Sequence, residues 1–156
     1  MKMMFGVLVL AGSLSAGDPT LGVDEAKIDG SGVLSIRCTF SFPSSHRVYS
    51  WRGSLQPAVG RILFVDVRDE RDRPIEVRAV AGPTPEFPHP GDVAAGTKIS
   101  YLEPIRLVPR RPDFKLTGCF RLRVRYDTGL LAARFRRRAR LDSVNAASEF
   151  VRICSP

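Results

Sequence analysis

The feature that most constrains the fold is a strict alternation of apolar and polar side chains in one early segment. Every second residue from Leu34 to Phe42 is apolar, and the residues between them are Ser35, Arg37, Thr39 and Ser41. A period of two places one set of side chains on a core face and the other set in water. The segment therefore predicts a half-buried β-strand with Cys38 on its inward face.

Further short segments have the composition of strands and are separated by turn residues. We expect strands at residues 61–68, 75–81, 98–108, 121–126 and 150–154. Residues 82–96 (GPTPEFPHPGDVAAG) are rich in Pro and Gly and predict a loop, and the Gly- and Asp-rich residues 18–32 predict a flexible lead-in. No segment before residue 129 has a helical period. Short strands separated by turns are typical of an all-β, antiparallel sandwich.

The N-terminal segment MKMMFGVLVLAGSLSAG has the layout of an export signal. A lysine precedes a short apolar run, and small residues follow it, so residues 1–17 predict a cleaved signal peptide. Ser13 stands where a bacterial lipoprotein signal carries its lipidated cysteine, so we expect a secreted or periplasmic protein without a lipid anchor. The rest of the chain has no second apolar run, which predicts no membrane span, and residues 33–156 are expected to form one domain.

The late part of the chain resembles the immunoglobulin-like sandwich domains of exported bacterial proteins. The resemblance lies in Gly118–Tyr126, in Leu141–Asn145 and in Phe150–Ile153, and it extends over residues 61–154. Two departures are that Phe120 replaces the usual Tyr and that the Ser and Asn of the second segment are not adjacent. The resemblance implies an immunoglobulin-like fold. Such domains serve as adhesins, inhibitors, chaperones and spacers, so the fold does not define a function.

Strand parity also suggests a pairing for the three cysteines. The segment 120–126 is apolar at its even positions, so Cys119 points outward. The last segment is apolar at its odd positions 151 and 153, so Cys154 points outward as well. An antiparallel pair of these strands would bring the two together, and export permits a disulfide. We therefore expect a Cys119–Cys154 disulfide and a buried Cys38 outside it, although the sequence leaves the other two pairings open.

Positive charge is concentrated in the last third of the chain. The sequence has 24 basic and 16 acidic residues, a net charge of +8, and residues 101–156 alone hold thirteen basic and five acidic side chains. Twenty of the basic residues are Arg, which is typical of a high-GC bacterial coding bias. The bias accounts for the choice of Arg over Lys, but not for the asymmetry along the chain.

The basic segment RFRRRARL (residues 134–141) admits two interpretations. As a strand, it places Arg134, Arg136, Arg138 and Arg140 on one face, and a hairpin with residues 121–126 would extend that face. As a helix, it forms a stripe from Leu130 to Leu141 that includes two arginines. We favour the strand, with a helix or a disordered segment as the alternative. The strand predicts a polyanion-binding face of eight arginines: Arg121, Arg123, Arg125, Arg134, Arg136, Arg138, Arg140 and Arg152.

Candidates for other chemistry are few. The two histidines, His46 and His89, have no metal-ligand spacing, and nothing resembles a nucleophile motif, so we expect neither an enzyme, nor a metal, nor a cofactor. The acidic residues between Asp66 and Asp72 alternate with arginines, which favours local ion pairs over a calcium site. An alternative binding ridge consists of Arg47, Tyr49, Trp51 and Arg52, although a single Trp is more often a core residue.

These features favour a monomeric binding protein. Its expected partner is an anionic envelope polymer, such as lipopolysaccharide or a teichoic-type polymer, or an acidic protein, because the planar fork of Arg matches phosphate and carboxylate. Export disfavours nucleic acid. Two alternatives stay open: the arginines form only a solvated surface, or the chain is an exported inhibitor or immunity-type protein that blocks a partner through its 47–52 ridge and its 82–96 loop.

Overall fold

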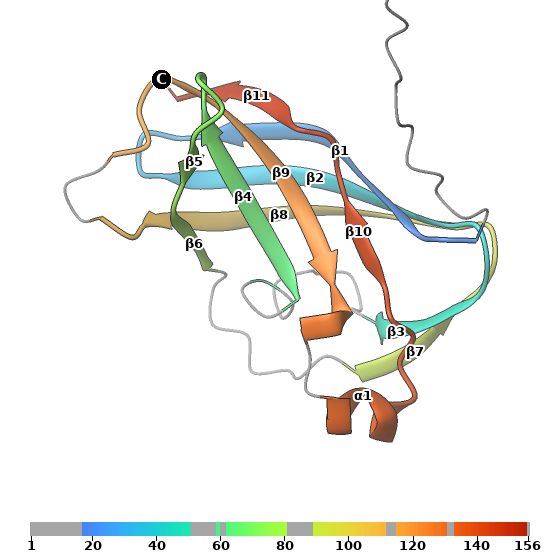
Figure 1. Cartoon of the computed structure of the whole chain (residues 1–156). Coiled ribbons are helices and arrows are strands. Elements are labelled where there is room, and N and C mark those ends of the chain that lie inside the picture. The colour runs from blue at the N-terminus through green and yellow to red at the C-terminus, as the bar shows by residue number, and fades with distance from the viewer. Residues whose placement is uncertain are drawn as a thin grey trace, which may run out of the picture.

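The computed structural model describes residues 17–50, 59, 62–80, 89–111, 115–130 and 133–155, and they form an all-β protein (Figure 1). The all-β expectation is therefore confirmed. Within these residues the helical structure consists of α1 (Ala133–Ala139) and a 3₁₀ turn at Thr128–Leu130. The strands are β1 (Thr20–Ile28), β2 (Val33–Phe42), β3 (His46–Ser50), β4 (Leu63–Asp69), β5 (Pro74–Ile75), β6 (Val77–Val80), β7 (His89–Val93), β8 (Thr97–Pro109), β9 (Cys119–Asp127), β10 (Asn145–Ala147) and β11 (Val151–Cys154).

The strands form two antiparallel sheets that pack face to face, with a short ribbon at one end (Figure 1). The first sheet has the order β1-β2-β8-β6. The second has the order β10-β9-β4-β5, and β11 follows β10 along the same edge of β9. Among the described strands, β3 and β7 pair with each other and with no third strand. The two layers meet where Phe40 of β2 packs edge-on against Tyr126 of β9, with ring centroids 5.4 Å apart.

The core follows the parity predicted for β2 and β9. All five apolar side chains of β2 from Leu34 to Phe42 are buried, and so are all four of β9 from Phe120 to Tyr126. Each strand contributes one complete face to a single hydrophobic cluster. Apolar surface removed from water is the main favourable term in folding, so these two strands form the centre of the molecule.

The predicted disulfide is present. Strand β11 runs antiparallel to β9 with Cys154 opposite Cys119, and their sulfur atoms are bonded. Cys38 is buried on the inward face of β2 and takes no part in the disulfide. The cross-link joins the beginning of β9 to the end of β11, so it closes the part of the chain that contains α1 and β10.

Three predictions about local structure are wrong. Residues 18–32 are not a flexible lead-in, because β1 pairs with β2 from Thr20 to Ile28. The expected loop at 82–96 contains β7, where Pro90 is tolerated because a two-stranded ribbon leaves one edge of each strand without a ladder. The expected strand at 75–81 divides into β5 and β6, which belong to different sheets. Residues 1–16 of the predicted signal peptide, residues 1–17, lie outside the described residues.

Candidate functional site

The eight arginines predicted to share one face are divided between two places. Residues 133–139 form α1, so the expectation of a strand over 134–141 is wrong. Arg and Ala are good helix formers, and the edges of β9 are already paired with β4 on one side and with β10 and β11 on the other. The arginines of α1 are thus separate from those on β9 and β11. We call the latter the sheet-face arginines: Arg121, Arg123, Arg125 and Arg152.

Each sheet-face arginine has an acidic partner. Asp66 accepts a hydrogen bond from Arg123 at 3.0 Å and lies 3.6 Å from Arg125. Arg152 donates to Glu70 at 2.8 Å, and Arg121 donates to Asp72. The acids come from β4 and from the turn that follows it, so they reach the outer face of the neighbouring strands. Opposite charges on adjacent strands stabilise a sheet, which explains how it tolerates these arginines.

Aromatic rings also contact the arginines of this face. The ring of Phe150 lies under the guanidinium groups of Arg123 and Arg68, at 4.9 and 5.0 Å from its centroid. The ring of Phe64 lies 5.2 Å from the guanidinium of Arg125. Cation–π contacts of this kind hold a cation in place. The sheet-face arginines are therefore engaged within the molecule, and the polyanion face predicted for them is already balanced by acids.

The turn after β4 is organised by Asp69. Its carboxylate accepts hydrogen bonds from the backbone N–H groups of Arg71 and Arg73, both at 2.9 Å. It also forms an ion pair with the Arg73 side chain. The backbone N–H of Arg73 is the largest cause that holds the pKa of Asp69 below its ordinary value. The ion-pair interpretation of this acidic segment is thus confirmed. The described residues contain no cluster of side chains suited to hold a metal ion.

The arginines of α1 are in a different state. Three of them and Arg140, which directly follows the helix, are exposed, and none of these four makes an ion pair within the part of the chain that the structure describes: Arg134, Arg137, Arg138 and Arg140. Arg136 is half-buried, and its Nε is buried without a hydrogen-bond partner among the same residues. We call these five residues the α1 cluster. Arg137 would fall on the opposite face of the predicted strand, but three-residue spacing places it beside Arg134 on the helix.

The end of α1 is fixed by its own backbone. Arg140 has φ 52°, in the left-handed region, and its N–H donates to the carbonyl of Arg137 at 3.2 Å. The N–H of Leu141 donates to the carbonyl of Arg136 at 3.0 Å. This is the Schellman arrangement, which most often has Gly at the position of Arg140. Positive side chains in the last turn also face the negative end of the helix dipole, which favours them.

Arg47 of β3 clamps α1 to the ribbon. Its backbone exchanges hydrogen bonds with Asp142, through N–H to Oδ2 at 2.7 Å and through its carbonyl from the Asp142 N–H at 2.9 Å. Its Nε donates to the carbonyl of Ala139 at 3.0 Å, and its Nη1 pairs with Asp92 of β7 at 3.0 Å. Arg47, predicted as part of a binding ridge, is therefore a positioning residue here. The Tyr49 side chain, Trp51 and Arg52 lie outside the described residues.

The other end of the α1 connection is held by a buried threonine. Thr128 is fully buried, and its Oγ1 donates to the carbonyl of Asp142 at 3.0 Å and accepts from the N–H of Val144 at 2.8 Å. The helix is thus fixed on both sides. Sequence reasoning missed Thr128, Asp92 and Asp142, because each contact joins residues far apart in the chain and no local pattern signals it.

His46 joins three segments beside this clamp. Its Nε2 lies 3.1 Å from Ser44 Oγ and 3.0 Å from the Gly17 carbonyl oxygen, and its Nδ1 lies 3.4 Å from Asp142 Oδ2. The residue types are those of a catalytic triad. However, the Ser44 hydroxyl donates its proton to the Gly17 carbonyl at 2.6 Å, so this proton is not directed at His46. The arrangement is that of a structural clamp. The side chain of His89 lies outside the described residues.

The 47–52 ridge and the 82–96 segment, predicted as an alternative binding site, meet at one end of the molecule. Figure 1 shows α1 below the sheets, next to β3 and β7. Strands β3 and β7 carry the described parts of the 47–52 ridge and of the 82–96 segment, and they pair with each other. We call this group of α1, β3 and β7 the ribbon end. It combines an exposed basic helix with a rigid support.

Comparisons with known proteins do not place the chain in a family. No protein-family model matches the sequence, and no curated protein matches it. Among solved structures, the crystal structure of the yjhA protein from Bacillus subtilis is similar over 87% of this chain and 93% of its own, with 14% identity and a TM-score of 0.36. A likeness at that level supports no argument about function. No helix in the described ranges is long and apolar enough to cross a membrane.

Proposed function

We propose that this chain is an exported binding protein that engages an anionic partner through the α1 cluster at the ribbon end. The partner is an anionic polymer of the cell envelope or an acidic protein surface. One observation carries the proposal: the sheet-face arginines are neutralised by acids within the molecule, whereas the exposed arginines of α1 are not. Arg matches phosphate and carboxylate groups with two parallel hydrogen bonds.

The position of α1 supports this assignment. We infer an immunoglobulin-like sandwich, because the order β1-β2-β8-β6 against β10-β9-β4-β5 corresponds to an A-B-E-D sheet against a G-F-C sheet with one added edge strand. In that scheme α1 lies in the F–G connection, and β3 and β7 lie in the B–C and D–E connections. Two of these, B–C and F–G, carry binding loops in immunoglobulin variable domains. The parallel is an analogy of fold and supports the site only in that sense.

Export is supported by two features. The N-terminal segment has the layout of a signal peptide, and the Cys119–Cys154 disulfide is of the kind that persists in oxidising compartments. An exported protein meets phosphate- and carboxylate-bearing polymers in the envelope. We therefore place the anion among these polymers or on the surface of another exported protein.

The test compares two variants with the same loss of charge. In one, the four exposed arginines of α1 become Gln (R134Q/R137Q/R138Q/R140Q), which keeps helix propensity. In the other, the four sheet-face arginines become Gln. Protein expressed from the full chain is passed over immobilised lipopolysaccharide at low and at high salt. We expect the α1 variant to lose retention and the sheet-face variant to keep most of it, and we expect salt to release the native protein.

Equal losses in the two variants would mean that only net charge matters and would contradict the proposal. If the partner is an acidic protein, the native protein should not be retained on lipopolysaccharide. It should instead be retained on an immobilised acidic protein, and the α1 variant should lose this retention.

An exported inhibitor or immunity-type protein is the second candidate. The observation that favours it is the ribbon, because β3 and β7 extend beyond the sheets next to α1 and present a rigid protrusion (Figure 1). Such a protein forms a stoichiometric complex that survives moderate salt, whereas polyanion binding weakens steeply with salt. Salt dependence of the retained complex therefore separates the two.

A further inference from the structure

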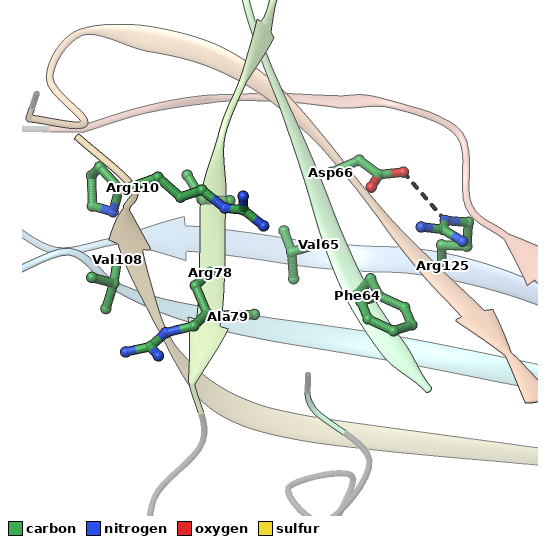
Figure 2. Close-up of a pocket in the computed structure, with 10 residues that line it drawn as sticks. Phe64, Val65, Asp66, Arg78, Ala79, Val108, Arg110 and Arg125 are labelled. Atoms are coloured by element: carbon green, nitrogen blue, oxygen red, sulfur yellow. Dashed lines mark ion pairs between the residues drawn. The ribbon is translucent and has the colours of Figure 1, made fainter. Parts of the chain in front are cut away.

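The chain crosses from one sheet to the other and leaves two strand edges open. Strand β5 pairs with β4 only at Val67 and Arg68, and after Glu76 the chain joins the other sheet as β6. On the side of β4 away from β9, Leu63 forms a parallel bridge with Val59, and Val65, between this bridge and β5, has no pairing partner among the described residues. Strand β6 pairs with β8 on one side, and no described strand pairs with its other side. Figure 2 shows these two edges facing each other across one side of the sandwich.

The register indicates which backbone groups point into this opening. In an antiparallel ladder, successive residues direct their N–H and C=O groups to opposite edges. The Asp127 N–H of β9 donates to the Ile62 carbonyl, so Ile62, Phe64 and Asp66 direct their backbone groups toward β9. Val65, at the opposite parity, directs its groups to the open edge. In the same way, the Arg110 N–H donates to the Glu76 carbonyl across β8, so Val77 and Ala79 direct theirs to the opening.

A groove occupies the space between these edges. Its volume is about 650 Å³, and both edges contribute to its lining, with Val65 on one side and Val77 and Ala79 on the other. A second hollow of about 500 Å³ continues along β5 and shares Val65 and Val77 with the first. Binding sites for extended or drug-sized ligands have volumes of about 300–1,000 Å³, so the groove is large enough for a few residues of extended chain.

Uncommitted positive charge flanks the groove. Arg78 and Arg110 are exposed members of its lining, and neither has an ion pair within the described part of the chain. In Figure 2 the side chain of Arg110 reaches into the gap between β6 and β4. The acid of this lining, Asp66, is already engaged by Arg123 and Arg125. The groove therefore combines open backbone groups and apolar walls with two available guanidinium groups.

We propose that this groove is a strand-addition site for an extended, acidic segment of a partner protein. The segment pairs through its backbone with β4 at Val65, in line with β5, and its acidic side chains contact Arg78 and Arg110. Backbone pairing supplies affinity in such complexes, and the side-chain contacts supply specificity. A second copy of this chain is a poor occupant, because pairing these edges would bring the arginines of both copies together, and charged edges oppose self-association.

The test uses the full chain and a labelled seven-residue peptide that alternates Val and Glu. We expect saturable binding to the native protein. The variant R78Q/R110Q should lose affinity roughly tenfold, as for two partly solvated charge pairs. The control R71Q/K98Q, which removes two exposed charges outside the groove, should bind with unchanged affinity. A peptide with the same side chains and an N-methyl group at every residue should not bind, because neither of its edges can then donate the backbone hydrogen bonds of a strand.

Three results would overturn the proposal. They are equal affinity for the N-methylated peptide, unchanged affinity in R78Q/R110Q, and a concentration-dependent dimer of the native protein that the peptide dissociates, because a second copy would then occupy the groove. The four-fold Gln variant of α1 should bind the peptide like the native protein. The strand-addition site and the proposed function of α1 can therefore fail independently of each other.

Discussion

Removing the disulfide should cost a large share of the stability of the protein. The perturbation is the double variant C119S/C154S. The cross-link closes a loop with a sequence separation of 35 residues, and the chain-entropy relation gives about 4 kcal/mol at 25 °C for a loop of that length. Cys154 is exposed and Cys119 is half-buried, so the hydroxyls themselves cost little. Native proteins are stable by about 5–15 kcal/mol, so the variant should be visibly weakened.

The assay is urea unfolding followed by far-UV circular dichroism. The free energy of unfolding of the double variant should be lower than that of the native protein by about 3–4 kcal/mol. A thiol reductant should lower the free energy of unfolding of the native protein to that of the double variant, and it should leave the value of the variant unchanged. A C38S variant serves as the contrast, because it should keep its sensitivity to reductant. A loss below about 1 kcal/mol in C119S/C154S, or resistance of the native protein to reductant, would refute the reasoning.

Three further outcomes are expected. R140G should raise the stability by about 1 kcal/mol, measured by urea unfolding, because Gly adopts the left-handed φ of this position without the cost that Arg bears; a decrease would contradict the helix ending described here. F40A should lower the stability by about 3–5 kcal/mol in the same assay, because the ring is buried between the sheets against Tyr126, and a loss under about 1 kcal/mol would place this ring outside the core. The backbone N–H of Arg73 lowers the pKa of Asp69 in the folded state. The ionised Asp69 carboxylate therefore stabilises the fold fully above the ordinary carboxyl pKa, and this stabilisation is lost as the pH falls below about 4. The melting temperature should fall less steeply in this acid range for D69N than for the native protein, and parallel curves would show that this carboxylate is not responsible.

The parts of the fold that the sequence predicts are those with local, regular signals. Strand β2 keeps a period of two from Leu34 to Phe42 without interruption, and every inward position is buried. The parity of β9 and β11 placed Cys119 and Cys154 on one face, which was enough to predict their disulfide. Parity works here because each strand has one buried face and no irregularity.

The missed elements lack such signals for physical reasons. Strand β1 has a register shift between Val23 and Glu25, which interrupts the alternation that identifies a strand. Strands β5 and β6 follow each other directly, and nothing in the sequence marks Glu76 as the point where the chain changes sheets. The α1 segment alternates like a strand at four arginines, but both edges of β9, the strand predicted to pair with it, are already occupied, so intrinsic helix propensity determines its structure.

The candidate site was predictable only in its residue types. The sequence identified the arginines but grouped those of β9 with those of α1, because neutralisation depends on acids from another strand. Asp66, Glu70 and Asp72 lie 49 to 82 residues from the sheet-face arginines they pair with. Contacts over such separations have no local pattern. The division into neutralised and available arginines is therefore visible only in three dimensions.

The most direct test of the central claim is to follow the individual arginines during binding. The Nε–Hε signals of the native protein are recorded by NMR while a soluble phosphorylated core oligosaccharide of lipopolysaccharide is added, and the two four-fold Gln variants assign them. We predict that the signals of Arg134, Arg137, Arg138 and Arg140 shift and saturate, while those of Arg121, Arg123, Arg125 and Arg152 stay in place because their acids hold them. Equal shifts in both groups, or shifts confined to the sheet-face arginines, would contradict the account.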